Sequence, residues 1–181
     1  MAEPTSWILD VRRRLAAAPA LEPVVADAAR RALLVPLFVD AGGLWALLRE
    51  GGAGEPEFPS APLAPGEDAW AAAQRAGGEA GLPAEAVLRL GELSPLERPE
   101  GGLALPCIGA VPTPAAMTAS DAGPSFRIPL SALRNPTLVE EMEVETPAGD
   151  RRRVRAIHVG GRRLWGTAVF VLEDLLERLT G

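Results

Sequence analysis

The sequence predicts a single layered domain of the α+β class. Its 181 residues are enough for one domain of ordinary size with a real core. Short apolar segments with the pattern of strands are mixed with a few amphipathic segments that have the pattern of helices. No internal repeat and no linker-like stretch divides the chain. We therefore expect residues 1–181 to form one domain.

The composition favours a globular protein located in the cytoplasm. Hydrophobic residues make up 48% of the chain and charged residues 23%. No apolar run approaches the roughly 18 residues that span a bilayer, and the first residues lack the pattern of a secretion signal. A net charge of −6 disfavours non-specific binding of nucleic acid, because phosphates are neutralised by a basic face. Cys107, the single cysteine, is expected to be a small buried apolar residue.

The first third of the chain predicts a helix and a β-hairpin. Ser6 can cap a helix over about residues 6–18, in which apolar side chains recur at helical spacing. The apolar run of residues 31–40 is followed by a Gly-containing turn and by a returning strand over residues 44–50. Pro36 favours an edge position or a bulge in the first of these strands, because proline cannot donate to a ladder.

We expect a chemical site in residues 58–82, if the protein has one. The stretch has the pattern of a loop rich in Pro, Ala and Gly, followed by a helix over about residues 67–80 and by Gly81. At about 100° per residue, small apolar side chains share one face, which can lie close to a sheet: Ala69, Ala72, Ala73, Ala76 and Ala80. The other face is polar and would point into a cleft or into solvent: Glu67, Asp68, Gln74, Arg75, Gly78 and Glu79.

The remaining segments complete the predicted set of elements. A short helical turn is predicted over residues 23–30 and a long loop over residues 112–124. Strands are predicted over residues 86–94, 103–111, 126–130, 138–146 and 151–159. An amphipathic helix over about residues 165–180 ends the chain, with Leu164 on its apolar face.

In this order the parts resemble the Nudix hydrolases, and within them the branch similar to coenzyme A pyrophosphatases. The resemblance covers nearly the whole chain. FPSAPLAPGED, from Phe58, takes the place of the family's FPGG and the following Gly-Glu. QRAGGEAGL, from Gln74, takes the place of its REUxEExGU segment, in which U is a bulky apolar residue. The most specific match lies near the C-terminus: Gly161, Leu164, Trp165, Gly166, Thr167 and Ala168.

The resemblance implies both a fold and a reaction class. The fold is a Nudix-type α/β/α sandwich, in which a mixed β-sheet lies between helices. Family members hydrolyse a nucleoside diphosphate linked to another moiety, with Mg²⁺ or Mn²⁺ held by Glu residues of the Nudix box. Hard oxygen ligands suit these ions, which neutralise the developing charge and activate water.

Most of the family's metal-binding positions are changed in this chain. The box Arg falls on Gln74, and the first Glu of the REUxEE segment falls on Arg75. The next Glu falls on Gly78, and only the last is kept, as Glu79. Glu67 matches the family's upstream Glu if a gap of one residue is allowed. Arg75 therefore puts a cation where a metal would be bound.

The candidate site residues have a role from the resemblance and an alternative. Glu79 and Glu67 are the candidates for catalysis and metal binding; otherwise Glu79 is a solvated carboxylate and Glu67 is favoured by the helix dipole. Arg75 and Arg49 are the candidates for binding substrate, although Arg75 can also be an exposed residue or pair with Glu79 four residues later. The segment GGAGEPE, from Gly51, replaces a longer motif of the coenzyme A branch, so specificity for coenzyme A is not expected.

Two hypotheses about function follow, and they leave open whether the chain is an enzyme. The favoured one is a Nudix-fold protein with lost or much reduced catalysis, which acts as a binding or structural module. One form of this hypothesis has the protein as a homodimer. The alternative is a divergent pyrophosphohydrolase that uses Mg²⁺ or Mn²⁺ and carboxylates outside the box, with these strand residues as candidates: Glu140, Glu141, Glu143 and Glu145. The expected ligand is a nucleotide or another phosphate-bearing small molecule.

Three other features of the sequence are open to more than one interpretation. A run of arginines is either a solvated strand face or a local anion-binding patch: Arg151, Arg152, Arg153, Arg155, Arg162 and Arg163. His158, the single histidine, is expected to be structural. Trp165 is expected to be a packing anchor at the start of the last helix, with ligand stacking as the alternative.

Overall fold

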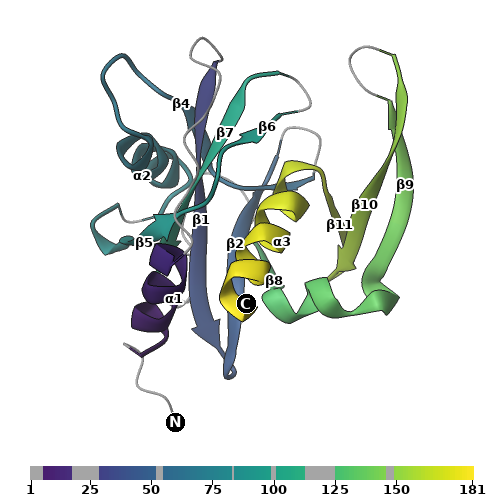
Figure 1. Cartoon of the computed structure of the whole chain (residues 1–181), viewed down its shortest axis with the longest axis horizontal. Coiled ribbons are helices and arrows are strands. Elements are labelled where there is room, and N and C mark those ends of the chain that lie inside the picture. The colour runs from purple at the N-terminus through teal and green to yellow at the C-terminus, as the bar shows by residue number, and fades with distance from the viewer. Residues whose placement is uncertain are drawn as a thin grey trace.

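The computed structural model describes residues 6–17, 29–51, 55–82, 84–98, 101–112, 125–145 and 149–181. Most of the predicted helical turn over residues 23–30 and of the predicted loop over residues 112–124 lies outside these ranges. Within them, a mixed β-sheet lies between helices, and a three-stranded sheet extends from one side (Figure 1). Each described helix is too short or too polar to span a bilayer.

The mixed sheet is built around β1 (Arg30–Asp40), which pairs with β7 (Leu103–Ala110) in parallel. Its path is β3-β2-β1-β7-β5, where β2 is Gly43–Glu50, β3 is Pro56–Glu57 and β5 is Leu88–Glu92. Three further strands join it, β4 (Ser60–Pro62) on β1, β6 (Leu96–Glu97) on β7 and β8 (Ser125–Pro129) on β2. The hairpin between β1 and β2 turns where the sequence predicts, with positive φ at Ala41 and Gly42.

The prediction of an edge position or a bulge for Pro36 is wrong, because β1 is an interior strand. On one side β1 pairs with β7 from Arg30 to Leu37, and on the other it pairs with β4 through Leu33 and with β2 from Leu37 onward. The N–H of Leu34 points to this second side, where it donates to Pro59 O at 2.8 Å. The nitrogen of Pro36 points the same way two residues later. Along β1, Pro36 lies between the residues that pair with β4 and those that pair with β2. No ladder hydrogen bond is therefore lost through its missing N–H.

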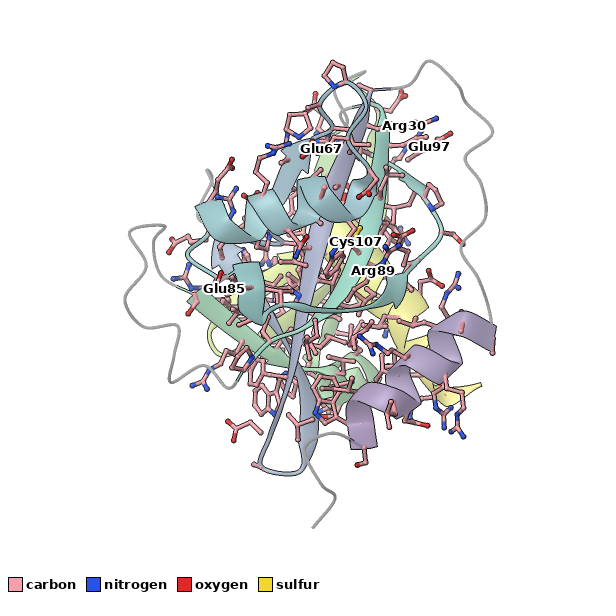
Figure 2. All side chains as sticks on the ribbon, turned by 90° about the vertical axis from the view of Figure 1, so that its left-hand side faces the viewer. Arg30, Glu67, Glu85, Arg89, Glu97 and Cys107 are labelled. Carbon is pink, nitrogen blue, oxygen red and sulfur yellow. The ribbon has the colours of Figure 1, made fainter. Side chains whose placement is uncertain are left out.

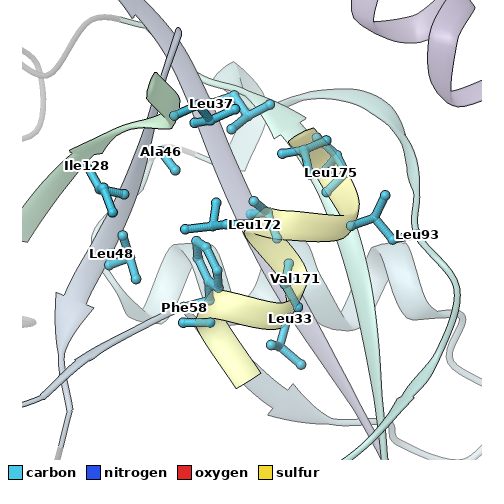
Figure 3. Packing of buried hydrophobic residues seen from close by; sticks show 14 of the residues in the cluster. Leu33, Leu37, Ala46, Leu48, Phe58, Leu93, Ile128, Val171, Leu172 and Leu175 are labelled. Atoms are coloured by element: carbon cyan, nitrogen blue, oxygen red, sulfur yellow. The ribbon is translucent and has the colours of Figure 1, made fainter. Parts of the chain in front are cut away.

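The side chains of β1 alternate between two hydrophobic layers, which is how the sheet comes to lie between helices. Leu33 and Leu37 face α1 (Ser6–Ala17) and α3 (Thr167–Thr180), where they join the larger core cluster (Figure 3). Leu34 and Phe38 face α2 (Ala69–Glu79), where they join a smaller cluster with its alanines. Cys107 is fully buried in this smaller cluster, as predicted.

The C-terminal helix begins later than predicted, because a short strand precedes it. Leu164 belongs to β11 (Arg162–Trp165), where it pairs with Ile157. Gly166, at a φ of 66°, then turns the chain into α3. β11 forms the three-stranded sheet with β10 (Arg151–Val159) and β9 (Val139–Glu145).

Two neighbouring glycines of α2 are expected to respond in opposite directions to replacement by alanine. A Cβ at Gly77 would lie 2.6 Å from Cδ2 of the buried Leu34, whereas a Cβ at Gly78 would meet nothing within 4 Å. Gly78→Ala is expected to raise the free energy of unfolding by about 0.5–1 kcal/mol through helix propensity. Gly77→Ala is expected to lower it by about 1 kcal/mol, because overpacking outweighs the same gain. Urea denaturation of the two variants measures both changes, and stabilisation by Gly77→Ala would contradict the close packing of α2 on β1.

Candidate functional site

The candidate site lies on the outer face of α2 and on the loop before it. Asp68 caps the helix, since its Oδ1 accepts a hydrogen bond from the N–H of Ala71 at 2.8 Å. Gly81, at a φ of 80°, ends it, and the N–H of Leu82 donates back to Gly77 O at 2.9 Å. The apolar face of α2 packs on the sheet, so its polar face points outward, as the helical pattern predicts.

Arg75 is the centre of the contacts on this face. Its Nε and Nη2 donate to Oε1 and Oε2 of Glu67 at 3.2 and 2.8 Å, so the two side chains form a bidentate ion pair. Its Nη2 also donates to the carbonyl oxygen of Pro62 at 2.9 Å. Its Nη1 lies 3.8 Å from Oε1 of Glu79. One guanidinium therefore spans the two carboxylates that were candidates for metal binding, and holds Glu67 more closely than Glu79.

Glu67 is fixed from two directions. Its Oε2 accepts a second hydrogen bond, from the N–H of Ala64 at 2.8 Å, and only 16% of its side chain is exposed. The hydrogen bond from Arg75 and, next, that from Ala64 hold the pKa of Glu67 below its ordinary value. The pKa of Arg75 is raised in turn by its hydrogen bond to Glu67. Glu67 is thus an ionised carboxylate whose counterion belongs to the protein.

The oxygen atoms around α2 do not fit a divalent cation. Both carboxylate oxygens of Glu67 are engaged by Arg75, and 64% of the Glu79 side chain is exposed to solvent. Among the described residues, no group of three or more Asp, Glu, His or Cys is placed to hold a metal ion. Mg²⁺ requires near-octahedral coordination by oxygen. The positive charge beside Glu67 and Glu79 is instead supplied by the guanidinium of Arg75.

Three carboxylates of β9, those of Glu140, Glu141 and Glu143, are engaged elsewhere. Oε1 of Glu140 lies 2.8 Å from Nε2 of His158 and accepts from Nε of Arg163 at 2.9 Å. Glu141 and Glu143 pair at longer range with arginines of β10, at 3.9 and 4.0 Å. These exposed cross-strand pairs favour the solvated-face interpretation of the arginine run.

Arg49, the other candidate for binding substrate, lies on β2 and shares no described contact with Arg75. Its Nη2 donates to Oε1 of Glu57 at 2.7 Å, while its Nε is buried and has no hydrogen-bond partner. A small cavity of about 120 Å³ beside it is also lined by Glu50 and Arg162, which pair at 3.3 Å. Among the contacts described, the candidate residues thus form two groups: Glu67, Arg75 and Glu79 on α2 and its loop, and Arg49 with Glu57.

A cavity of about 550 Å³ opens between α1, β5 and the start of α2. Glu67, Arg30, Arg89 and Cys107 line it (Figure 2). Burial raises the pKa of the Cys107 thiol to about 12, so the thiol stays protonated at neutral pH and is a poor nucleophile. Arg89 pairs with Glu92 at 2.6 Å and lies over the ring of Trp70. The cavity thus has charged walls but no assembled nucleophile.

Comparison with solved structures defines the fold. The MutT/nudix family protein from Enterococcus faecalis matches 99% of this chain with 75% of its own, at a TM-score of 0.55 and 14% sequence identity. The chain has the Nudix fold. The Ap4A hydrolase from C. elegans matches 57% of the chain with 82% of its own, at a TM-score of 0.47 and 20% identity. No protein-family model and no curated protein matches the sequence. In this Nudix fold, α2 is the helix that the sequence resemblance assigns to the box.

Proposed function

We propose that this Nudix-fold protein is a binding module for a phosphate-bearing small molecule, and that hydrolysis through a metal at the box position is lost. The observation that supports the proposal is the guanidinium of Arg75, which bonds both oxygens of Glu67 and lies beside Glu79. The class of ligand follows from the resemblance of the sequence to hydrolases of nucleoside diphosphate derivatives.

Arg75 is a poor group to exchange for a metal ion. Arginine keeps its proton at any physiological pH, so the cation cannot be removed by titration. A divalent ion would have to break the bidentate ion pair between Arg75 and Glu67. The further carboxylate beside Arg75 is that of Glu79. The described residues on the outer face of α2 can bind, orient and neutralise charge, and among them no three Asp, Glu, His or Cys side chains are placed to hold a metal ion.

The proposal predicts no metal-dependent turnover of nucleoside diphosphate derivatives. Purified protein is incubated with coenzyme A and with ADP-ribose in the presence of Mg²⁺ or Mn²⁺, and products are separated by chromatography. Because Arg75 already neutralises Glu67, we expect product formation no greater than in the matched Glu79→Gln variant. Turnover that requires the metal and disappears in Glu79→Gln would contradict the proposal and support the divergent hydrolase.

A further inference from the structure

The cavity of about 550 Å³ between α1, β5 and the start of α2 has no part in the proposed function. It occupies a region on the α2 side of the sheet that α2 leaves uncovered (Figure 2). The cluster beneath α2 contains Ala32 and Leu34 of β1 and Cys107 of β7. Two earlier residues on the same faces of these strands, Arg30 and Leu105, are exposed and half-buried. The 11-residue helix therefore covers only the later part of both strands on this side.

The walls of this cavity carry more positive charge than their carboxylates balance. Three arginines and three carboxylates line it: Arg12, Arg30, Arg89, Glu67, Asp68 and Glu92. Arg75 binds Glu67 without lining the cavity itself, so four cations face three carboxylates. Arg89 and Glu92 neutralise each other at 2.6 Å, and Asp68 is the N-cap of α2. The excess positive charge is therefore that of Arg12 and Arg30.

Arg12 is held in place by a neutral acceptor. Its Nε and Nη2 both donate to the backbone oxygen of Arg89, at 2.9 and 2.6 Å. β5 is irregular between Arg89 and Gly91, and a Cβ at Gly91 would lie 2.9 Å from Cδ1 of Leu15, so α1 packs directly against this bulge. The contact fixes the guanidinium without neutralising it, and its Nη1 makes no described hydrogen bond. A donor that is already positioned loses less conformational entropy when it binds a ligand.

Arg30 contributes the second unbalanced cation, from the start of β1. Its guanidinium forms no hydrogen bond or ion pair with the described residues. Glu97 of β6 flanks the same residue of β7 as Arg30 does, Leu103, but the two charges form no described ion pair. The backbone oxygen of Arg30 accepts a hydrogen bond from the N–H of Leu63 at 3.2 Å, and both residues line the cavity. A cation and an apolar side chain therefore adjoin in one wall.

We propose that this cavity binds a small organic anion, with Arg12 and Arg30 at its charged head group and leucines around its apolar body. The apolar lining includes Leu15, Leu63, Leu90, Leu93 and Leu105. An excess of one positive charge fits a singly charged head group such as a carboxylate, whereas a diphosphate would leave negative charge unbalanced. A volume of about 550 Å³ is typical of small-molecule sites. The proposal concerns a second ligand and stands whether or not hydrolysis is lost.

The probe is anilinonaphthalene sulfonate, which joins one negative charge to an apolar body and fluoresces when it is bound. Arg30→Gln and Arg31→Gln are the matched pair, because these neighbours on β1 line cavities on opposite faces of the sheet. Fluorescence titration of the full chain is carried out at constant ionic strength. We expect Arg30→Gln to bind the probe about fivefold more weakly than the wild type, which corresponds to about 1 kcal/mol for a solvent-accessible ion pair. Arg31→Gln is expected to bind it like the wild type.

A second pair of variants tests the same wall without removing an arginine. Leu63→Glu places a carboxylate beside Arg30, whereas Leu63→Gln removes the same apolar side chain and adds no charge. Leu63→Glu is expected to abolish binding of the probe, and Leu63→Gln is expected to retain it with reduced affinity. The uncharged analogue of the probe, N-phenylnaphthylamine, is expected to bind the wild type and Arg30→Gln equally, because it lacks the sulfonate.

Several outcomes would overturn the site. They are the absence of probe binding by the wild type, equal weakening by Arg30→Gln and Arg31→Gln, and equal binding by Leu63→Glu and Leu63→Gln. Displacement of the probe by pyrophosphate at a lower concentration than by octanoate would overturn the class of ligand. Metal-dependent hydrolysis of ADP-ribose, together with the expected pattern of probe binding, would contradict the proposed function alone.

Discussion

Replacing Arg75 with Glu is expected to convert the outer face of α2 into a divalent-cation site. The substitution removes the guanidinium that bonds Glu67 and puts a third carboxylate between Glu67 and Glu79. Without a cation the three carboxylates repel one another, and with Mn²⁺ they supply the hard oxygen ligands that the ion requires. The variant is expected to melt well below the wild type in the presence of a chelator and to regain stability as Mn²⁺ is added, whereas the wild type should not respond.

The matched control is Arg75→Gln, which removes the cation without adding a carboxylate. It is expected to melt lower than the wild type and to respond weakly to Mn²⁺. An equal response of Arg75→Glu and Arg75→Gln to Mn²⁺ would contradict the assignment of Arg75 to the position of a metal.

The same pair is expected to show a defined pH dependence. The pKa of Glu67 is lowered in the folded protein, chiefly by Arg75, so the folded state is stabilised above the ordinary pKa of 4.5. That stabilisation is lost as the pH falls through the lowered pKa and Glu67 is protonated. The difference in melting temperature between the wild type and Arg75→Gln should therefore be largest near neutral pH and should decrease as the pH falls below the ordinary pKa of Glu67.

Replacing Leu172 with Ala is expected to lower the free energy of unfolding by about 2–5 kcal/mol, because it leaves a cavity in the main core. Leu172 lies fully buried on the face of α3 that packs against the sheet (Figure 3), whereas Phe170 on the same helix is 55% exposed. Phe170→Ala is the matched control, and its effect should stay within about 0.5 kcal/mol, as for other surface substitutions. Urea denaturation measures both variants. Equal effects would contradict the packing of α3 against the sheet.

The elements of the fold follow from local patterns, but their order in the sheet does not. Alternation and turn residues predict the hairpin of β1 and β2. The parallel pairing of β1 with β7 joins segments about 70 residues apart, and no local pattern encodes it. The prediction of an edge position or a bulge for Pro36 is wrong for this reason. A proline is tolerated there because β1 changes its partner from β4 to β2 at that point. β11 has four residues, which are too few for strand alternation to distinguish it from the start of α3. Leu164 therefore fits both the strand pattern and the helix pattern.

The site was predictable in its residues and not in its contacts. Helical spacing puts Arg75 beside Glu79, and the structure confirms that they are near, at 3.8 Å. The closer partner is Glu67 at 2.8 Å, which the loop before α2 brings back to the helix. Loop conformation depends on hydrogen bonds such as that from Ala64 to Glu67, which periodicity does not describe.

The contact of Arg75 with Glu67 also affects the loop. A metal ion bound at this position would leave when the surrounding ion concentration falls, and the loop would lose its attachment to the helix. A tethered guanidinium does not leave, and its effective concentration is set by its tether rather than by the solution. Because Arg75 also bonds Pro62 O, and Glu67 also bonds the N–H of Ala64, one side chain of α2 anchors both ends of residues 62–67. The shape of this loop is thereby independent of the supply of divalent ions.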